Sequence, residues 1–302
     1  MLKSKNKQGK TIILFLGALI LFIAFSITNG TSVQAAQKYV AKSAGNNSIY
    51  VKDVKTGCYI LFLDNTKDIV YKGNKIYYIK NYQCEENQTP KLCQYDVKTK
   101  KHKTLVKFTG IYDQYDICDL YSGSIYINCW VGSDCIYCYR YIIKDKKLKK
   151  IDKFAGYVQR YKNRIVLDPT SVYGSPGFFP IYIYDTLTGK IKTLTKTANG
   201  GYFTKKTIYY ANALTKRDTD YFKKGGVKTS IKKYSLETGK IKTLVKSIKL
   251  NQVEIITDKY VCYNIFKNNG NKYYIYNIKT RKKKSYNRDK YYKIVDKFYK
   301  KR

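Results

Sequence analysis

The chain has 302 residues and carries 59 Lys and Arg against 21 Asp and Glu, a formal net charge of +38 at pH 7. A low-GC genome enriches lysine codons, but glutamate codons are also A-rich and only four Glu occur, so codon bias does not explain the shortage of acids. The length excludes one ordinary β-sandwich, and a surface of this sign attracts polyanions in a salt-dependent way.

The N-terminal segment has the three parts of a secretory signal peptide. A lysine-rich head precedes the apolar run 11–25, and Val33 and Ala35 occupy the small-residue positions of a cleavage site. We predict a signal peptide over residues 1–35 and one domain over residues 36–302, with an uncleaved membrane anchor as the alternative. No cysteine lies near the cleavage site, which excludes lipid attachment there, and no second apolar stretch is long enough to cross a bilayer.

The rest of the chain is a repeat. The phrase "YDTLTGKIKTLTK" from Tyr184 recurs as "YSLETGKIKTLVK" from Tyr234. Each phrase predicts a β-hairpin, in which Gly189 and Gly239 supply the positive φ that a tight turn needs. Related phrases begin at Lys52, Tyr95, Tyr141 and Tyr276.

A second pair of strands precedes each hairpin, as "GYFTKKTIYYAN" precedes the hairpin at Tyr234. Four strands in about 40–50 residues make one blade of a β-propeller. We predict an all-β, six-bladed β-propeller whose last blade is shared between the two termini. Residues 291–302 would supply its opening strands and the N-terminal segment its hairpin, leaving no free edge. The rival architecture is an open double sandwich.

These repeats resemble the TolB-like and lipoprotein-receptor-like six-bladed propellers, which are common as secreted proteins of Gram-positive bacteria. The resemblance covers most of residues 38–302 and implies the fold rather than an activity. The receptor-type "YWTD" signature is absent from the sequence, so no receptor role is implied.

The loops between the second and third strands of each unit vary in length, and variable loops on a rigid scaffold often bind ligands. Two long loops combine aromatic side chains with cations, which suits stacking on sugars or bases together with phosphate contact. An ordinary long loop with its own aromatic anchor is the alternative. The candidate residues are Tyr173, Phe178, Phe179, Lys216, Arg217, Tyr221, Phe222, Lys223 and Lys224.

Three polar residues are expected to line a central channel: Asp119, Gln159 and Glu254. Channel carboxylates would permit glycoside chemistry, although polar lining is the simpler interpretation. His102 is the only histidine and no nucleophile motif accompanies it. We therefore predict no catalytic residue, no metal and no cofactor.

Two cysteine pairs flank loops of the same kind: Cys84 with Cys93, and Cys129 with Cys135. In a secreted protein such pairs predict disulfide bonds that staple the hairpins. For the other four cysteines, the sequence is compatible with either disulfide bonds or free thiols.

Lysine clusters mark the turns of successive hairpins, as in "KTKKHK" and "KDKKLKK". We expect a monomeric, non-enzymatic binding or scaffold protein. We also expect it to be secreted, to have no stable membrane insertion after signal cleavage, and to be retained at a Gram-positive cell wall. Its partner would be teichoic acid, an anionic glycan, extracellular nucleic acid or another protein. No nucleic-acid recognition motif is present. The alternative function is a carbohydrate-active enzyme that uses the channel carboxylates.

Overall fold

The chain divides into two compact units, 1–37 and 38–302. The computed structural model describes residues 38–45, 47–83, 88–110, 112–132, 134–151, 154–168, 177–215, 219–220 and 222–300, with side chains left out at 134–136 and 201. The predicted signal peptide therefore lies outside the described residues. Within the described part, no helix is both long and apolar enough to span a membrane.

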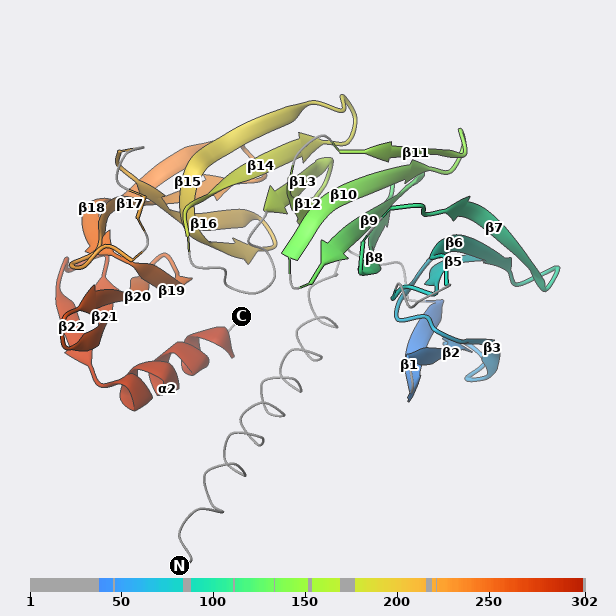
Figure 1. The fold of residues 1–302 in the computed structure, drawn as a ribbon, viewed down its shortest axis with the longest axis horizontal. Helices are drawn as coiled ribbons and strands as arrows, with labels where there is room; N and C mark the ends of the chain where they lie inside the picture. Colours follow the sequence, from blue (N-terminus) through green and yellow to red (C-terminus); the bar gives the residue numbers. More distant parts are fainter. Residues whose placement is uncertain are drawn as a thin grey trace, which may run out of the picture. The chain divides into compact units, whose positions relative to one another are not determined.

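The second unit is built of antiparallel sheets that follow one another along the chain, which confirms the all-β prediction (Figure 1). The first sheet contains β1 (Tyr39–Gly45), β2 (Ser48–Asp53) and β3 (Tyr59–Leu63). The second contains β4 (Ile69–Lys72), β5 (Lys75–Lys80), β6 (Lys91–Asp96) and β7 (Lys101–Lys107). The third contains β8 (Gln114–Tyr121), β9 (Ser124–Val131), β10 (Asp134–Ile142) and β11 (Lys147–Lys150).

The fourth sheet has seven strands because one long strand serves two groups of four. These are β12 (Gly156–Tyr161), β13 (Arg164–Asp168), β14 (Phe179–Asp185), β15 (Ile191–Thr204), β16 (Thr207–Ala213), β17 (Val227–Ser235) and β18 (Ile241–Leu250). The first half of β15 pairs with β14 and its second half with β16. The last sheet contains β19 (Gln252–Ile256), β20 (Tyr260–Lys267), β21 (Gly270–Asn277) and β22 (Lys283–Tyr286).

Apolar side chains on both faces of the strands hold consecutive sheets together. In β5, Ile76 packs in a cluster with Val51 of the first sheet, whereas its neighbour Tyr77 packs in a cluster with Tyr115 of the third. Successive side chains of a strand point to opposite faces, so a strand between two sheets must be apolar at nearly every position. The same division recurs at β9, β13, β16 and β20.

The hairpins that end each group of strands share one turn; we call them the outer hairpins (β2–β3, β6–β7, β10–β11, β14–β15, β17–β18 and β21–β22). Asp185 Oδ1 accepts hydrogen bonds from the backbone N–H groups of Leu187 and Thr188, both at 2.9 Å. The predicted positive φ is confirmed at Gly189 (70°) and Gly239 (72°). The matching position in the other turns is Gly57, Lys100, Lys146 or Arg281, each with φ between 52° and 74°.

The prediction of strands at residues 291–302 is wrong: the segment forms helix α2 (Arg288–Tyr299). Asn287 caps the helix, because its Oδ1 accepts a hydrogen bond from Lys290 N at 3.0 Å. Tyr291 and Val295, four residues apart, are buried, so the segment has helical rather than alternating periodicity.

Helix α2 packs on the last sheet (Figure 1), on the face opposite the one that meets β16–β18. Tyr291 and Val295 join Ile255, Cys262 and Ile275 in this cluster. The first sheet correspondingly has three strands in the order β1-β2-β3, and no strand from the C-terminal segment pairs with β1. The prediction that the two termini share a blade is therefore wrong for the described residues.

Tyr291 gives a direct test of this packing. Its side chain is fully buried, so Tyr291→Ala should lower the free energy of unfolding by about 3 kcal/mol. Its hydroxyl has no hydrogen-bond partner among the described residues, so Tyr291→Phe should raise the free energy of unfolding by about 1 kcal/mol. Denaturant unfolding measures both, with the exposed Lys293→Ala as a neutral control. An alanine variant as stable as the unmodified protein would contradict the docking of α2.

Candidate functional site

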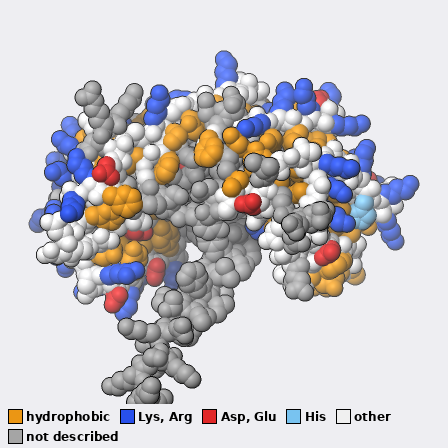
Figure 2. All heavy atoms as spheres, viewed as in Figure 1, with side chains coloured by type: hydrophobic (Ala, Val, Ile, Leu, Met, Phe, Trp, Pro, Cys, Tyr) orange, Lys and Arg blue, Asp and Glu red, His pale blue; other side chains and the backbone are white. Residues whose placement is uncertain are grey.

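The outer hairpins carry exposed lysines without acidic partners. The ion pairs of the described residues are Lys67–Asp116, Arg160–Asp119, Lys206–Glu237 and Lys233–Asp258, and of their lysines only the half-buried Lys233 of β17 belongs to an outer hairpin. The exposed cations of these hairpins include Lys98, Lys100, Lys101, Lys103, Lys144, Lys146, Lys147, Lys149, Lys190, Lys192, Lys240, Lys242, Arg281, Lys282, Lys283 and Lys284. Figure 2 shows Lys and Arg side chains outnumbering Asp and Glu on the face it presents.

The acids of these hairpins serve the turns instead. Asp53, Asp96 and Asp185 each accept two backbone hydrogen bonds within their own turn. The backbone N–H of Thr188 is the main cause that lowers the pKa of Asp185 below its ordinary value, with the N–H of Leu187 contributing and desolvation opposing. These three acids are engaged by their turns, and the exposed hairpin lysines have no carboxylate partner among the described residues.

The candidate loop residues are only partly described. Tyr173, Lys216, Arg217 and Tyr221 lie outside the described residues.

In the described part of these loops, Phe178 and Phe179 are half-buried, whereas Phe222, Lys223 and Lys224 are exposed. The Phe222 ring stacks on Phe266, with centroids 6.1 Å apart. The described residues do not bring the two loops together as one site.

Asp119 is held in an ion pair between sheets. Its Oδ2 accepts hydrogen bonds from Arg160 Nε at 2.5 Å and from the Tyr157 hydroxyl at 2.9 Å. The side chains of Arg160 and Asp119 are only 12% and 18% exposed, and the guanidinium lies 3.8 Å from the centroid of the Tyr121 ring. A carboxylate with these partners links β8 to β12, and a role as a free general base has no support from its geometry.

The other two channel candidates also have structural contacts. Gln159 Nε2 donates to the backbone oxygen of Thr204 at 3.0 Å. Glu254 lies beneath α2, where its Oε1 accepts from the Tyr292 hydroxyl at 3.4 Å and its backbone oxygen accepts from the Tyr299 hydroxyl at 2.7 Å. Burial raises the pKa of Glu254, and the hydrogen bond from Tyr292 partly offsets this.

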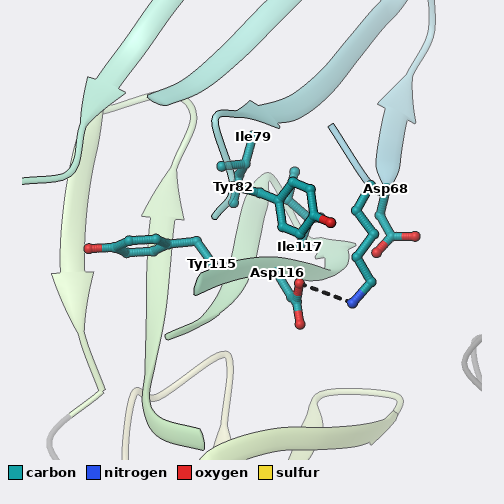
Figure 3. A pocket seen from close by; sticks show the side chains of 7 residues that line it. Asp68, Ile79, Tyr82, Tyr115, Asp116 and Ile117 are labelled. Carbon is teal, nitrogen blue, oxygen red and sulfur yellow. Dashed lines mark hydrogen bonds and ion pairs between the residues drawn. The ribbon is translucent and has the colours of Figure 1, made fainter. Parts of the chain in front are cut away.

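The sequence prediction missed a small pocket between the second and third sheets (Figure 3). Lys67 and Asp68, which precede β4, face Asp116 of β8, and the Lys67 ammonium lies 3.3 Å from Asp116 Oδ1. The space in this pocket is small, about 170 Å³ even with open solvent counted, whereas ligand pockets begin at roughly 300 Å³. A sugar ring does not fit. No local sequence signal predicted this pocket, because Lys67 and Asp116 are 49 positions apart.

Asp68 is exposed to the pocket, yet protein atoms surround it on most sides. Desolvation by this environment raises the pKa of Asp68 to about 6, and repulsion from Asp116 adds to the rise while attraction to Lys67 opposes it.

The cysteine predictions have different outcomes. Cys93 is a buried free thiol 4.0 Å from Thr104 Oγ1, so the predicted Cys84–Cys93 bridge is not seen, and Cys84 lies outside the described residues. The side chain of Cys135 is also outside them, so the bridge from Cys129 stays a prediction.

The remaining candidates for chemistry are few. His102 Nδ1 lies 2.8 Å from the Tyr78 hydroxyl and the ring packs against Tyr95, so the histidine is part of the tyrosine packing of the second sheet. Among the residues that the structure describes, no group of three His, Cys, Asp or Glu side chains is placed to hold a metal ion.

The chain matches no protein-family profile and no curated protein sequence. Solved structures to which this chain is similar include TolB from Acinetobacter baumannii, at 15% identity over 81% of this chain and 61% of TolB, with a TM-score of 0.35. The β-propeller domain of the Trilobed protease from Pyrococcus furiosus is described as having an open velcro topology. It matches at 14% identity over 82% of this chain and 78% of that domain, with a TM-score of 0.40. An oligogalacturonate lyase in complex with manganese matches at 10% identity over 78% of this chain and 69% of the lyase chain, with a TM-score of 0.38. This chain spans less than two thirds of the TolB chain, and the similarities carry no information on ligand or activity.

The raised pKa of Asp68 predicts a pH dependence. The folded chain binds this proton more tightly than the unfolded chain, so ionisation of Asp68 costs stability as the pH rises from about 4 to about 6. Asp68→Asn removes this cost, and its stability relative to the unmodified protein should rise over that interval and then level off.

Thermal unfolding at pH 4, 5, 6 and 7 measures the difference between the two curves. Asp145→Asn, which removes an exposed carboxylate from the β10–β11 turn, controls for the loss of one negative charge. A stability difference between Asp68→Asn and the unmodified protein that does not change with pH would show that the Asp68 carboxyl is not desolvated.

Proposed function

We propose that the protein is a secreted, non-enzymatic binding propeller that associates with anionic polymers of the cell surface through its outer hairpins. The observation that carries the proposal is the set of exposed hairpin lysines that have no carboxylate partner among the described residues. Unpaired cations on successive hairpins bind a polyanion by releasing its counterions, without needing a shaped pocket.

The propeller architecture belongs to the same proposal. The described sheets comprise the three-stranded first sheet, three four-stranded sheets and the seven-stranded sheet, in which β15 joins two groups of four. Counting β15 in both groups supports six blades, the number of hairpin phrases in the sequence. Each unit would present one lysine-bearing hairpin at the rim of the propeller.

An enzymatic function has no specific observation in its favour. Asp119 is paired with Arg160, Glu254 lies beneath α2, and the pocket at Asp68 and Asp116 is too small for a sugar ring. Secretion and retention at a Gram-positive wall follow from the N-terminal sequence and the charge, and remain proposals together with the monomeric state.

Binding to poly(glycerol phosphate), the backbone of teichoic acids, tests the function. Replacing Lys144, Lys146, Lys147 and Lys149 by Gln removes four cations from the β10–β11 hairpin. We expect the affinity to fall about tenfold at low salt, and the slope of log Kd against log salt to fall by about 0.7 for each lysine that had been engaged.

A matched variant removes the same charge from α2, by replacing the exposed Lys290, Lys293, Lys297 and Lys300 with Gln. It should bind nearly as tightly as the unmodified protein. Equal losses in both variants would show that only net charge matters, and no binding by the unmodified protein would refute the proposed function.

A further inference from the structure

The first sheet has one face that no other described element covers. Its Ile49 and Val51 pack in a cluster with the second sheet, whereas Tyr50 between them points the other way and is 43% exposed. On the same face, Tyr59 and Phe62 of β3 are 61% and 51% exposed. We call Lys42, Tyr50, Lys52, Tyr59 and Phe62 the terminal face.

Every other sheet has both faces in apolar clusters. The second sheet contributes to clusters with the first and the third, and the last sheet contributes to clusters with β16–β18 and with α2. The stretch from Ile49 to Val51 has the continuous apolar character of a strand buried on both faces, yet one face is bare. Three large aromatic side chains on one exposed sheet face are a mark of a binding surface.

The aromatic rings of the terminal face form a continuous row with Tyr50 in the middle. Its centroid lies 5.3 Å from that of Tyr59 and 5.0 Å from that of Phe62, with interplanar angles of 56° and 50°. The register places Tyr50 directly opposite Phe62, and Lys52 directly opposite Tyr59. The row is therefore fixed by strand pairing, and its formation does not depend on a ligand.

Cations flank the row. Lys42 of β1 is directly opposite Tyr50, and the Lys52 ammonium lies 5.9 Å from the centroid of the Tyr59 ring. The acids of β2 and of the residue after β3 are engaged elsewhere: Asp53 accepts hydrogen bonds from the amides of its own turn, and Asp64 accepts from the Ser48 hydroxyl at 2.8 Å. An occupant of this face must combine negative charge with surface that packs on aromatic rings.

We propose that the terminal face binds an anionic polysaccharide, whose sugar rings lie on Tyr50, Tyr59 and Phe62 while its acidic groups pair with Lys42 and Lys52. This inference rests on the proposed function and narrows the polymer to one with sugar rings along its length. The C–H groups on one face of a pyranose are attracted to the negative face of an aromatic ring. Tilted rings already in contact with each other form a ridged surface, which suits the C–H groups of a sugar better than the flat face of a nucleobase.

The test compares three probes on the purified protein: alginate, a uronic-acid polymer; polyphosphate, which has charge without rings; and oligo(dT). The triple variant Tyr50→Ser, Tyr59→Ser, Phe62→Ser removes the aromatic row from exposed positions. We expect its affinity for alginate to fall at least about tenfold, and its affinity for polyphosphate to change less than about twofold. The control Val131→Ser, Phe154→Ser, Leu214→Ser removes three exposed apolar side chains elsewhere and should bind alginate as the unmodified protein does.

The other possible results contradict either the proposed function or the glycan site. If the unmodified protein binds neither polyphosphate nor alginate, the proposed function fails. If it binds both and the triple variant matches it, the proposed function stands and the glycan site is refuted. A loss confined to oligo(dT) would assign the face to nucleic acid, and a dimer in sedimentation that the triple variant abolishes would assign it to a second copy of the chain; both refute the glycan site.

Discussion

The fold depends on the burial of both faces of each interior sheet. Alternate side chains of one strand pack on the preceding and the following sheet, as Ile76 and Tyr77 do in β5. Burial of roughly 25 cal/mol per Å² of apolar surface on both faces drives this stacking. The tyrosine-rich strands suit it, because tyrosine contributes a large apolar ring while its hydroxyl reaches a polar partner or solvent.

A stack of this kind has two ends, and the chain treats them differently. At the C-terminal end, α2 covers the last sheet with Tyr291 and Val295, in the way that a capping repeat covers the end of a repeat protein. At the N-terminal end, the face with Tyr50, Tyr59 and Phe62 is exposed. The helix stabilises one end within the chain, whereas the aromatic row leaves the other end available to a partner.

The sheets also have outer edges, where lysine has two physical roles. β7, β11, β18 and β22 each lie at the edge of a sheet, and all four carry lysines. Charge on an edge strand prevents pairing with the edge of another molecule, since two lysine-bearing edges repel each other. The same charge attracts a polyanion, so protection against edge pairing and the proposed polymer binding would use one set of side chains. Salt weakens both roles, because it screens the repulsion between edges and reduces the counterion release that drives polyanion binding.

The sequence alone determined the hairpins, because their turns depend on neighbouring residues. The acceptor at Asp185 and the positive φ at Gly189 lie within one short phrase. The strand type and much of the core followed in the same way from apolar runs bounded by turns. The C-terminal helix was also a local feature, with Asn287 as its cap, but its tyrosines resemble those of the strands and hid the helical spacing.

The state of the carboxylates was decided only by the tertiary structure. Asp119 was predicted as a channel residue, but its partner Arg160 is 41 positions away, and Asp116 meets Lys67 across 49 positions. A pattern in the sequence shows which charges exist, whereas their pairing depends on which sheets pack together. For the same reason the bare face of the first sheet was not predictable, because exposure of one face depends on the absence of a neighbouring sheet among the described residues.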